Sequence, residues 1–368
     1  MIGAVRTTLP ASFYTDQTHF RREVEHFFLG KWICAGRTDE LADRGDYALR
    51  DVLSESVIIT RNESEGLSAF ANVCRHRGTR LCEAPSGTFP GSIQCPYHAW
   101  TYDLRGHLIG APHMDDVAGF DRRDYPLRAV ACDVWDGHVF VNLSEATGGP
   151  APAPLRAQLG ALVDRFRPWQ MDDLRRVQRT VYDVRANWKL IVQNYNECLH
   201  CPVLHPLLNQ MHHYLGADNA PSEAAYCGGT MGFKEGVETL SRDGRRRRAY
   251  LPGLGDAEKS MVSYFSIYPN LLLTLHPDYM VTVTLWPKAP DRTTLVSEWH
   301  FHRDEIARPG FEFQDAVDFW DVTNREDWHI SELAQAGISS RAYRPGPYSN
   351  RELLLGDFDE VVRRELGL

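Results

Sequence analysis

Hydrophobic and polar residues follow two different periods in successive parts of the chain. Residues 16–29 repeat apolar side chains at helical spacing, with Phe20, Val24 and Phe27 on one side. Short runs with strand-like composition follow, separated by glycine-rich and polar turns. These runs lie at residues 56–60, 67–73, 91–94, 127–131 and 138–142. The pattern predicts an N-terminal helix followed by a small antiparallel β domain.

The pattern changes after Gly148–Pro154, a glycine- and proline-rich segment with the composition of a linker. Beyond it we expect helices at residues 157–166, 188–199 and 311–336, and strands at 263–275, 280–286 and 294–302. Strands and helices in this order predict an α+β arrangement around a central antiparallel sheet. We therefore predict an α+β protein with three parts. They are an N-terminal helix (1–30) packing on the larger domain, a small β domain (31–147), and the larger α+β domain (155–368).

Composition and charge narrow the class of protein. The chain has 368 residues, of which 43% are hydrophobic and 24% charged, as in ordinary globular proteins. Its net charge of −9 argues against nucleic-acid binding. No apolar run reaches the ~20 residues of a membrane span, and the first residues lack the apolar core of a signal peptide. We therefore expect a cytoplasmic protein whose eight cysteines are thiols or metal ligands rather than disulfides.

Two pairs of cysteine and histidine lie in the predicted β domain. Cys74 and His76 are two residues apart, and Cys95 and His98 are three apart. Zinc binds Cys₂His₂ sets, but its usual spacing pairs cysteine with cysteine and histidine with histidine. One thiolate and one imidazole in each half favour a Rieske [2Fe–2S] centre, in which two cysteines hold one iron and two histidines the other. Cys82, between the two pairs, is interpreted as a plain buried thiol.

A second group of metal-ligand residues lies in the larger domain. Glu197 and His200 are three residues apart and would share a helix face. Pro202 interrupts the helix, which lets His205 return beside His200. Two histidines and one carboxylate that leave coordination positions open form the facial triad of non-haem Fe(II) oxygenases. The residues themselves do not show which carboxylate completes the set.

The motifs CRHRG, CPYHAW and NWKLIVQNYNECLHCPVLHP resemble those of the catalytic α subunit of Rieske non-haem iron oxygenases, and the resemblance covers nearly the whole chain. The later segments YFSIYPNLLLTLHPDY and VTNREDWHISELAQAGISSRAYRPG are most similar to the branch that acts on quaternary ammonium compounds. That branch includes glycine-betaine, carnitine and choline monooxygenases and proline-betaine demethylases.

The resemblance implies roles for particular residues. It makes 31–147 the Rieske domain and 155–368 the catalytic domain, and it places the third iron ligand at Asp327. The neighbours Asp318, Asp321 and Glu326 could be mistaken for that ligand. It also implies that Glu197 joins a Rieske histidine of one subunit to an iron-bound histidine of the next. The chain is then expected to form a head-to-tail homotrimer.

The resemblance further implies the reaction and its cofactors. Each chain would hold one Rieske [2Fe–2S] cluster and one mononuclear Fe(II), and would use O₂ to hydroxylate or N-demethylate a small quaternary ammonium substrate. NAD(P)H and flavin would be bound only by a partner reductase, since this chain has no G-x-G-x-x-G fingerprint. Aromatic faces hold such cations. The candidate cage residues are Tyr195, Tyr264, Tyr268, Tyr279, Trp286 and Trp320.

Two other functions stay open at this point. One is a ring-hydroxylating oxygenase for an aromatic acid, with the same iron chemistry and a flat apolar pocket. The other is a Rieske electron-transfer protein or a zinc-stabilised binding domain without catalysis, against which His200 and His205 count. The one concentrated basic segment, Arg245–Arg248, is interpreted as a solvated loop, with docking of an acidic redox partner as the alternative.

Overall fold

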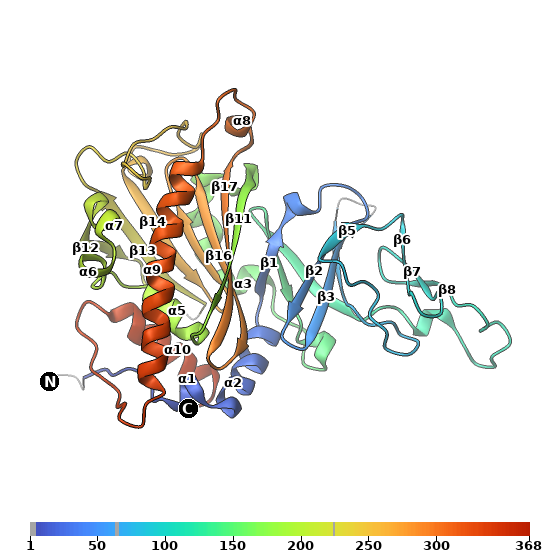
Figure 1. Ribbon diagram of the computed structural model, residues 1–368. Helices are drawn as coiled ribbons and strands as arrows, with labels where there is room; N and C mark the ends of the chain where they lie inside the picture. The colour runs from blue at the N-terminus through green and yellow to red at the C-terminus, as the bar shows by residue number, and fades with distance from the viewer. Residues whose placement is uncertain (1–4, 63–65, 224) are drawn as a thin grey trace. The chain divides into compact units, whose positions relative to one another are not determined.

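The computed structural model describes residues 5–62, 66–223 and 225–368, and it divides the chain into two compact units (Figure 1). One unit spans Phe28–Ala157. The other combines the segment up to Phe27 with Gln158–Leu368. Both contain antiparallel sheets, and the second also contains the long helices, so the predicted α+β class is confirmed. In the described parts of the chain, no helix is both long and apolar enough to cross a membrane.

The smaller unit is built from short antiparallel strands. Its main sheet has the order β1-β10-β9-β4-β3-β2-β5, and a second sheet has the order β6-β7-β8. Buried side chains such as Ile58, Phe70 and Ile93 form its core. The strands are β1 (Ile33–Arg37), β2 (Asp46–Val52), β3 (Glu55–Arg61), β4 (Leu67–Ala71), β5 (Ser86–Thr88), β6 (Ser92–Gln94), β7 (Thr101–Asp103), β8 (Leu108–Gly110), β9 (Ala129–Trp135) and β10 (His138–Asn142).

The larger unit is organised around one seven-stranded antiparallel sheet with the order β11-β17-β16-β15-β14-β13-β12. Its central strands are apolar and almost wholly buried, which suits strands covered on both faces. The strands are β11 (Leu174–Val184), β12 (His212–Asn219), β13 (Tyr226–Phe233), β14 (Met261–Ile267), β15 (Leu271–Leu275), β16 (Met280–Ala289) and β17 (Arg292–His302).

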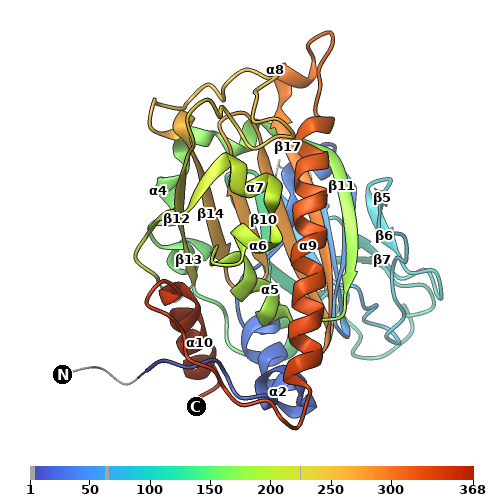
Figure 2. The same ribbon diagram turned by 60° about the vertical axis from the view of Figure 1, so that its left-hand side comes forward.

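Helices of the larger unit position the site residues. Figures 1 and 2 show α9 running along the sheet with α5, α6 and α7 at its side. The side chain of Asn187 accepts a hydrogen bond from the Lys189 N–H and caps α5, while Gln335 of α9 accepts one from the Asn187 N–H at 2.9 Å. The helices are α1 (Ser12–Thr15), α2 (Gln17–Glu23), α3 (Leu155–Leu159), α4 (Leu162–Arg165), α5 (Trp188–Tyr195), α6 (Cys201–Leu204), α7 (Pro206–Met211), α8 (Arg303–Ile306), α9 (Gln314–Ile338) and α10 (Leu353–Glu365).

The N-terminal helix is tied to α5 by a buried ion pair. Lys189 Nζ lies 2.5 Å from Glu23 Oε1, and both side chains are fully buried. The indole N–H of Trp188 donates to the other oxygen of Glu23 at 2.8 Å. Removing one partner of such a pair would leave an uncompensated charge inside the protein, so the pair holds α2 against α5.

Several element boundaries differ from the sequence prediction. The helix expected to reach residue 199 ends at Tyr195, and the one expected over 157–166 is split at Gly160, whose φ is 53°. The run 263–275 is two strands joined by a turn. The edge strands β11 and β12, the glycine-rich β13 and helix α10 were not predicted.

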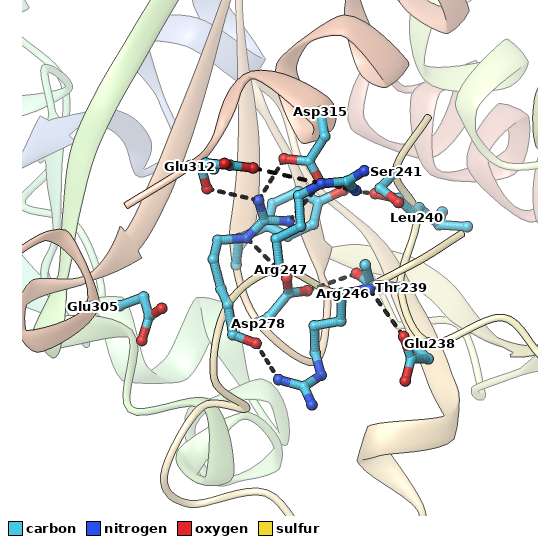
Figure 3. Close-up of polar contacts among 12 residues, drawn as sticks. Glu238, Thr239, Leu240, Ser241, Arg246, Arg247, Asp278, Glu305, Glu312 and Asp315 are labelled. Atoms are coloured by element: carbon cyan, nitrogen blue, oxygen red, sulfur yellow. Dashed lines mark hydrogen bonds and ion pairs between the residues drawn. The ribbon is translucent and has the colours of Figure 1, made fainter. Parts of the chain in front are cut away.

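The interpretation of Arg245–Arg248 as a solvated loop was wrong for its last member. Arg248 is 1% exposed; its Nε lies 2.9 Å from Asp278, and its Nη1 lies 2.5 Å from Asp315. Arg247 pairs with Asp243 and Asp315. Figure 3 shows Arg247, Asp278 and Asp315 gathered in one cluster. Asp278 lies in the turn before β16, and Asp315 lies at the start of α9. Because both residues are distant in sequence, the basic run alone does not reveal that they pair with Arg248.

Candidate metal centres

Two loops of the smaller unit share one backbone pattern, and each begins at a predicted cysteine ligand. The N–H of Cys74 donates to the Thr79 carbonyl, and the Cys74 carbonyl accepts from the N–H of Gly78. Cys95 repeats both bonds, with Trp100 and Ala99 as partners. Gly78 and Ala99 both adopt left-handed backbone, with φ of 75° and 57°. The two loops therefore present their thiols in matching ways.

The four predicted cluster ligands divide by burial. Cys74 and Cys95 are 2% and 3% exposed, whereas His76 is exposed and His98 half-buried, with ring centroids 4.7 Å apart. The hydroxyl of Tyr102 lies 3.4 Å from Cys74 Sγ. Burial raises the pKa of Cys95, while backbone N–H groups that donate to its sulfur lower it. Two inner thiols with nearby donors and two outer imidazoles fit a cluster with one thiolate-bound and one imidazole-bound iron.

Cys82 lies in the same unit, between the two cysteine–histidine pairs in sequence. It is a half-buried free thiol whose Sγ lies 4.0 Å from Asn72 Oδ1. Burial raises its pKa to about 11, so it stays protonated and unreactive at neutral pH.

In the larger unit, His200, His205 and Asp327 come together. Their ligand atoms all lie within 4.8 Å of one another. Asp327 Oδ1 lies 2.9 Å from His205 Nε2 and 3.5 Å from His200 Nε2. His200 and His205 flank the short helix α6, and Asp327 comes from α9. Two imidazoles and one carboxylate around a common point are the donor set of a mononuclear iron site.

Each histidine also contacts a second carboxylate through its Nδ1 atom, the ring nitrogen that faces away from Asp327. His200 Nδ1 lies 2.5 Å from Glu197 Oε1, and His205 Nδ1 lies 2.7 Å from Glu326 Oε2. These contacts fix the ring orientations and leave both Nε2 atoms facing Asp327. Sequence reasoning considered Glu326 only as a residue to be mistaken for the ligand. Its position beside Asp327 on a helix was the signal that could have revealed it.

The protonation equilibria show that this cluster favours a cation. Burial lowers the pKa of His200, but hydrogen bonds to Asp327 and Glu197 outweigh it and raise the pKa to about 9. Burial also lowers the pKa of His205, and Asp327 and Glu326 raise it above its ordinary value. In the absence of a metal the imidazoles therefore take up protons, and a divalent cation would replace that positive charge.

Two details of this region differ from the sequence-based description. Glu197 and His200 do not share a helix face, because α5 ends at Tyr195 and the two residues meet across a turn. Cys198 and Cys201 form a disulfide with a Cα–Cα distance of 5.0 Å, although free thiols or metal ligands were expected. The disulfide closes a loop of four residues that contains His200.

Asp318 and Asp321 of α9, the two remaining carboxylates considered as possible iron ligands, have other partners. Asp318 pairs with Arg242 at 3.2 Å. Asp321 accepts a hydrogen bond from Tyr182 at 2.6 Å and pairs with Arg325 at 2.8 Å. Neither belongs to the group around the two histidines.

A cavity of about 240 Å³ adjoins the histidine–aspartate cluster. Of the six aromatic cage candidates, Tyr195, Tyr264 and Trp320 line it. Tyr268, Tyr279 and Trp286 are not among its lining residues. Tyr214, which the sequence did not single out, also lines the wall. The cavity thus combines aromatic faces with the acidic residues Glu197 and Asp327.

Comparison with known proteins identifies the class. A family model for the Rieske [2Fe–2S] domain matches residues 31–121, and one for the ring hydroxylating alpha subunit (catalytic domain) matches residues 171–367. The chain therefore belongs to the Rieske non-haem iron oxygenases, as an oxidoreductase subunit that contains both domains. Members carry a Rieske cluster and a mononuclear iron and receive electrons from a reductase.

Within this family the chain is similar to proteins that act on quaternary ammonium compounds. It is 33% identical to the carnitine monooxygenase oxygenase subunit of Escherichia coli (strain K12), over 92% of this chain and 86% of that protein. It is 28% identical to the glycine betaine monooxygenase oxygenase subunit of Pseudomonas aeruginosa (strain UCBPP-PA14), over 93% and 85%. The quaternary ammonium Rieske monooxygenase CntA in complex with L-carnitine superposes with a TM-score of 0.82 at 27% identity, over 98% and 96%.

Proposed function

We propose that this protein is the terminal oxygenase that hydroxylates or N-demethylates a small quaternary ammonium substrate, using O₂ and electrons from a flavin and iron–sulfur reductase. One observation carries the proposal. The His200–His205–Asp327 cluster adjoins a cavity lined by tyrosine and tryptophan side chains. Aromatic faces attract a cation that cannot donate hydrogen bonds, and the relatives named above act on such cations.

We infer that Cys74, His76, Cys95 and His98 hold the Rieske cluster, and that His200, His205 and Asp327 hold the mononuclear iron. The assignment divides the chain into a Rieske domain (31–147) and a catalytic domain (155–368), with the N-terminal helix (1–30) on the latter. Each donor set fits its metal group: paired thiols and imidazoles for two irons, and two imidazoles with one carboxylate for a single iron. When bound, these groups would supply the redox chemistry, namely single-electron transfer and the activation of O₂.

The protein residues would orient and protect the reaction. Glu197 and Glu326 fix the two imidazole rings. The aromatic wall would hold the cationic nitrogen with one N-methyl group toward Asp327. One oxygen atom of O₂ is then inserted into a C–H bond of that methyl. The other oxygen atom takes up two electrons and two protons and leaves as water. The C–N bond of the resulting N-hydroxymethyl ammonium cation then breaks, which releases formaldehyde and a proton and leaves the tertiary amine.

We further propose a head-to-tail homotrimer in which electrons cross between subunits. Glu197 contacts His200 and lines the cavity. Its second carboxylate oxygen would take part in the path from a neighbouring Rieske histidine, which makes Glu197 the bridge between two metal centres. We also propose a cytoplasmic location, because the reaction needs NAD(P)H and the reductase.

The proposed function is tested by NADH-dependent O₂ uptake with a compatible reductase. The substrate panel contains betaines, carnitine, choline and aromatic acids, and formaldehyde is assayed in parallel. Substrate-dependent O₂ uptake with a quaternary ammonium compound supports the proposal. Turnover of aromatic acids alone would replace it with the ring-hydroxylating alternative.

Subunit mixing tests electron transfer between chains. One variant lacks Cys74 and so has no cluster, and the other lacks His200 and so has no mononuclear iron. We expect neither homotrimer to be active and the mixed trimers to recover activity. Inactive mixed trimers that contain both metals would exclude transfer between subunits.

A further inference from the structure

The cavity beside the histidine–aspartate cluster has an uneven distribution of charge. Glu197 and Asp327 contribute negative charge to its wall. Arg351 is the only lysine or arginine among the described residues that line it. Arg351 lies just before α10, on a segment separate in sequence from both acidic residues, together with the lining residues Asn350 and Leu353. One cavity is therefore lined by acidic residues from two segments and by an arginine from a third.

The guanidinium of Arg351 has no partner within the described parts of the chain. The backbone N–H of Arg351 donates to Ser349 Oγ, but its side chain makes neither an ion pair nor a hydrogen bond there. Other arginines near the C-terminus are engaged: Arg344 donates to two backbone carbonyls, and Arg363 lies over the ring of Phe13. Arg351 is thus an exposed, unpaired arginine among the residues that line the cavity, and its side chain is available to a ligand.

We propose that Arg351 binds the carboxylate of the substrate, so that this enzyme prefers zwitterionic quaternary ammonium carboxylates to quaternary ammonium alcohols. The proposal rests on the function proposed above and refines its substrate class. A zwitterion such as a betaine carries opposite charges a few bonds apart. The cavity offers aromatic side chains for the cationic nitrogen and Arg351 for the carboxylate. Arginine suits this role because its planar fork binds a carboxylate through two parallel hydrogen bonds.

The exposure of Arg351 determines how large its effect should be. A charge pair that stays in contact with water is partly screened by salt. We therefore expect Arg351 to change substrate affinity about tenfold, and we expect the effect to shrink as ionic strength rises. We expect kcat to change little, because the carboxylate binds the same group in the ground state and in the transition state.

The test compares Arg351→Gln with wild type in the full-length, metal-loaded oxygenase. Glycine betaine and carnitine serve as carboxylate probes, and choline serves as the probe without a carboxylate. Binding is measured by calorimetry, independently of turnover, and KM and kcat are measured with the reductase. We expect Arg351→Gln to raise Kd and KM about tenfold for a carboxylate probe, to leave kcat unchanged, and to shift choline less than twofold.

Two further variants make the result specific. Arg351→Lys keeps the charge but not the fork and should recover part of the affinity. Arg344→Gln removes an exposed arginine from the same segment that does not line the cavity, and it should leave all probes unchanged. A low-salt titration should show the largest difference between Arg351→Gln and wild type.

The outcomes separate this proposal from the one on which it rests. Suppose that wild type oxidises quaternary ammonium compounds. If Arg351→Gln then changes the binding of choline and of the carboxylates equally, or changes neither, Arg351 is not the carboxylate site. If wild type binds and oxidises no quaternary ammonium compound, the proposed function itself is overturned, and the refinement fails with it.

Discussion

Helix α9 contributes a carboxylate to each of two charged clusters, and the negative charge of the two clusters is compensated in different ways. Near its start, Asp315 joins Asp278 around the buried guanidinium of Arg248. Further along, Asp327 meets two imidazoles, each held from outside by another carboxylate. The first cluster contains its own permanent cation. The second contains only histidines, which become cationic by taking up protons.

This difference distinguishes a structural ion pair from a metal site. A buried carboxylate is stable only if its charge is compensated, because burial without a partner costs several kcal/mol. Arg248 compensates Asp278 permanently, so that cluster has no need of a ligand. The acidic residues around His200 and His205 raise the pKa of both rings, so these protons supply the positive charge at the site that we propose for the iron.

The largest expected effect comes from removing the carboxylate of the second cluster. Asp327→Ala should lose the mononuclear iron and reduce turnover below detection, while the optical and electron paramagnetic resonance spectra of the Rieske cluster persist. Iron analysis should fall from about three atoms per chain to about two. Asp321→Ala is the matched control, since Asp321 lies on the same helix and contacts Tyr182 and Arg325. Full iron and activity in Asp327→Ala would place the third ligand elsewhere.

Breaking the first cluster should affect stability rather than metal content. Arg248→Met leaves Asp278, which is 1% exposed, without its cation. We expect the free energy of unfolding, measured with denaturant, to fall by about 3–5 kcal/mol. Arg245→Met, in the same basic run but exposed, should change it by no more than about 0.5 kcal/mol.

If Arg248→Met fails to fold, the double variant with Asp278→Asn provides a second measurement. Removing the uncompensated carboxylate should restore part of the lost stability. A double variant that is no more stable than Arg248→Met would show that Arg248 acts through packing against Tyr279 and Phe301 rather than through charge.

Asp359 is a buried carboxylate outside both clusters. Its negative charge can be removed by binding a proton, and this can be tested. Burial raises its pKa from 3.8 to about 6, against hydrogen bonds from Tyr348 and Gln193 that lower it. Between pH 4 and pH 6 the unfolded chain ionises at this position while the folded protein keeps the proton, so rising pH destabilises the fold. We expect Asp359→Asn to gain about 2–3 kcal/mol relative to wild type between pH 4 and pH 7. Parallel unfolding curves with no pH-dependent difference would contradict this.

The smallest expected effect concerns the outer carboxylate of His205. Glu326→Gln keeps a hydrogen-bonding side chain but removes the charge that orients the ring. Iron affinity, measured by competition with a chelator, should weaken about 10–100-fold. Glu332 lies on the same helix and forms a surface pair with Arg185, so Glu332→Gln should leave the affinity unchanged. If the two variants bind iron with equal affinity, Glu326 does not contribute to iron binding through His205.

The sequence predicted features that depend on local spacing better than those that depend on distant partners. The Cys-x-His and Cys-x-x-His loops and the buried central strands are local patterns, and the structure contains the loops and the strands. The strand β11 was missed because it lies at the edge of its sheet, contains three arginines and shows no regular alternation of buried and exposed residues. The strand β13 was also missed, because its three glycines interrupt the pattern of apolar side chains that indicates a strand.

The same distinction applies to the charged residues. Arg248 is separated from Asp278 and Asp315 by 30 and 67 residues, so a basic run looked solvated although its last member is buried. Asp327 was placed by family resemblance, and no spacing within the chain identified it. The contact between Glu326 and His205 arises only when α9 lies beside α6, so the sequence showed the two residues but not their pairing.

The long helix α9 also has a consequence for changes in chain length. Asp315 and Asp327 are twelve residues apart on one continuous helix, which corresponds to about 18 Å along its axis. Deleting a single residue between them would turn one carboxylate about 100° around the helix and draw it about 1.5 Å along the axis relative to the other. Either the guanidinium or the histidines would then lose their partner. Insertions and deletions in this stretch are therefore less tolerable than most substitutions, because the helical phase connects the two clusters.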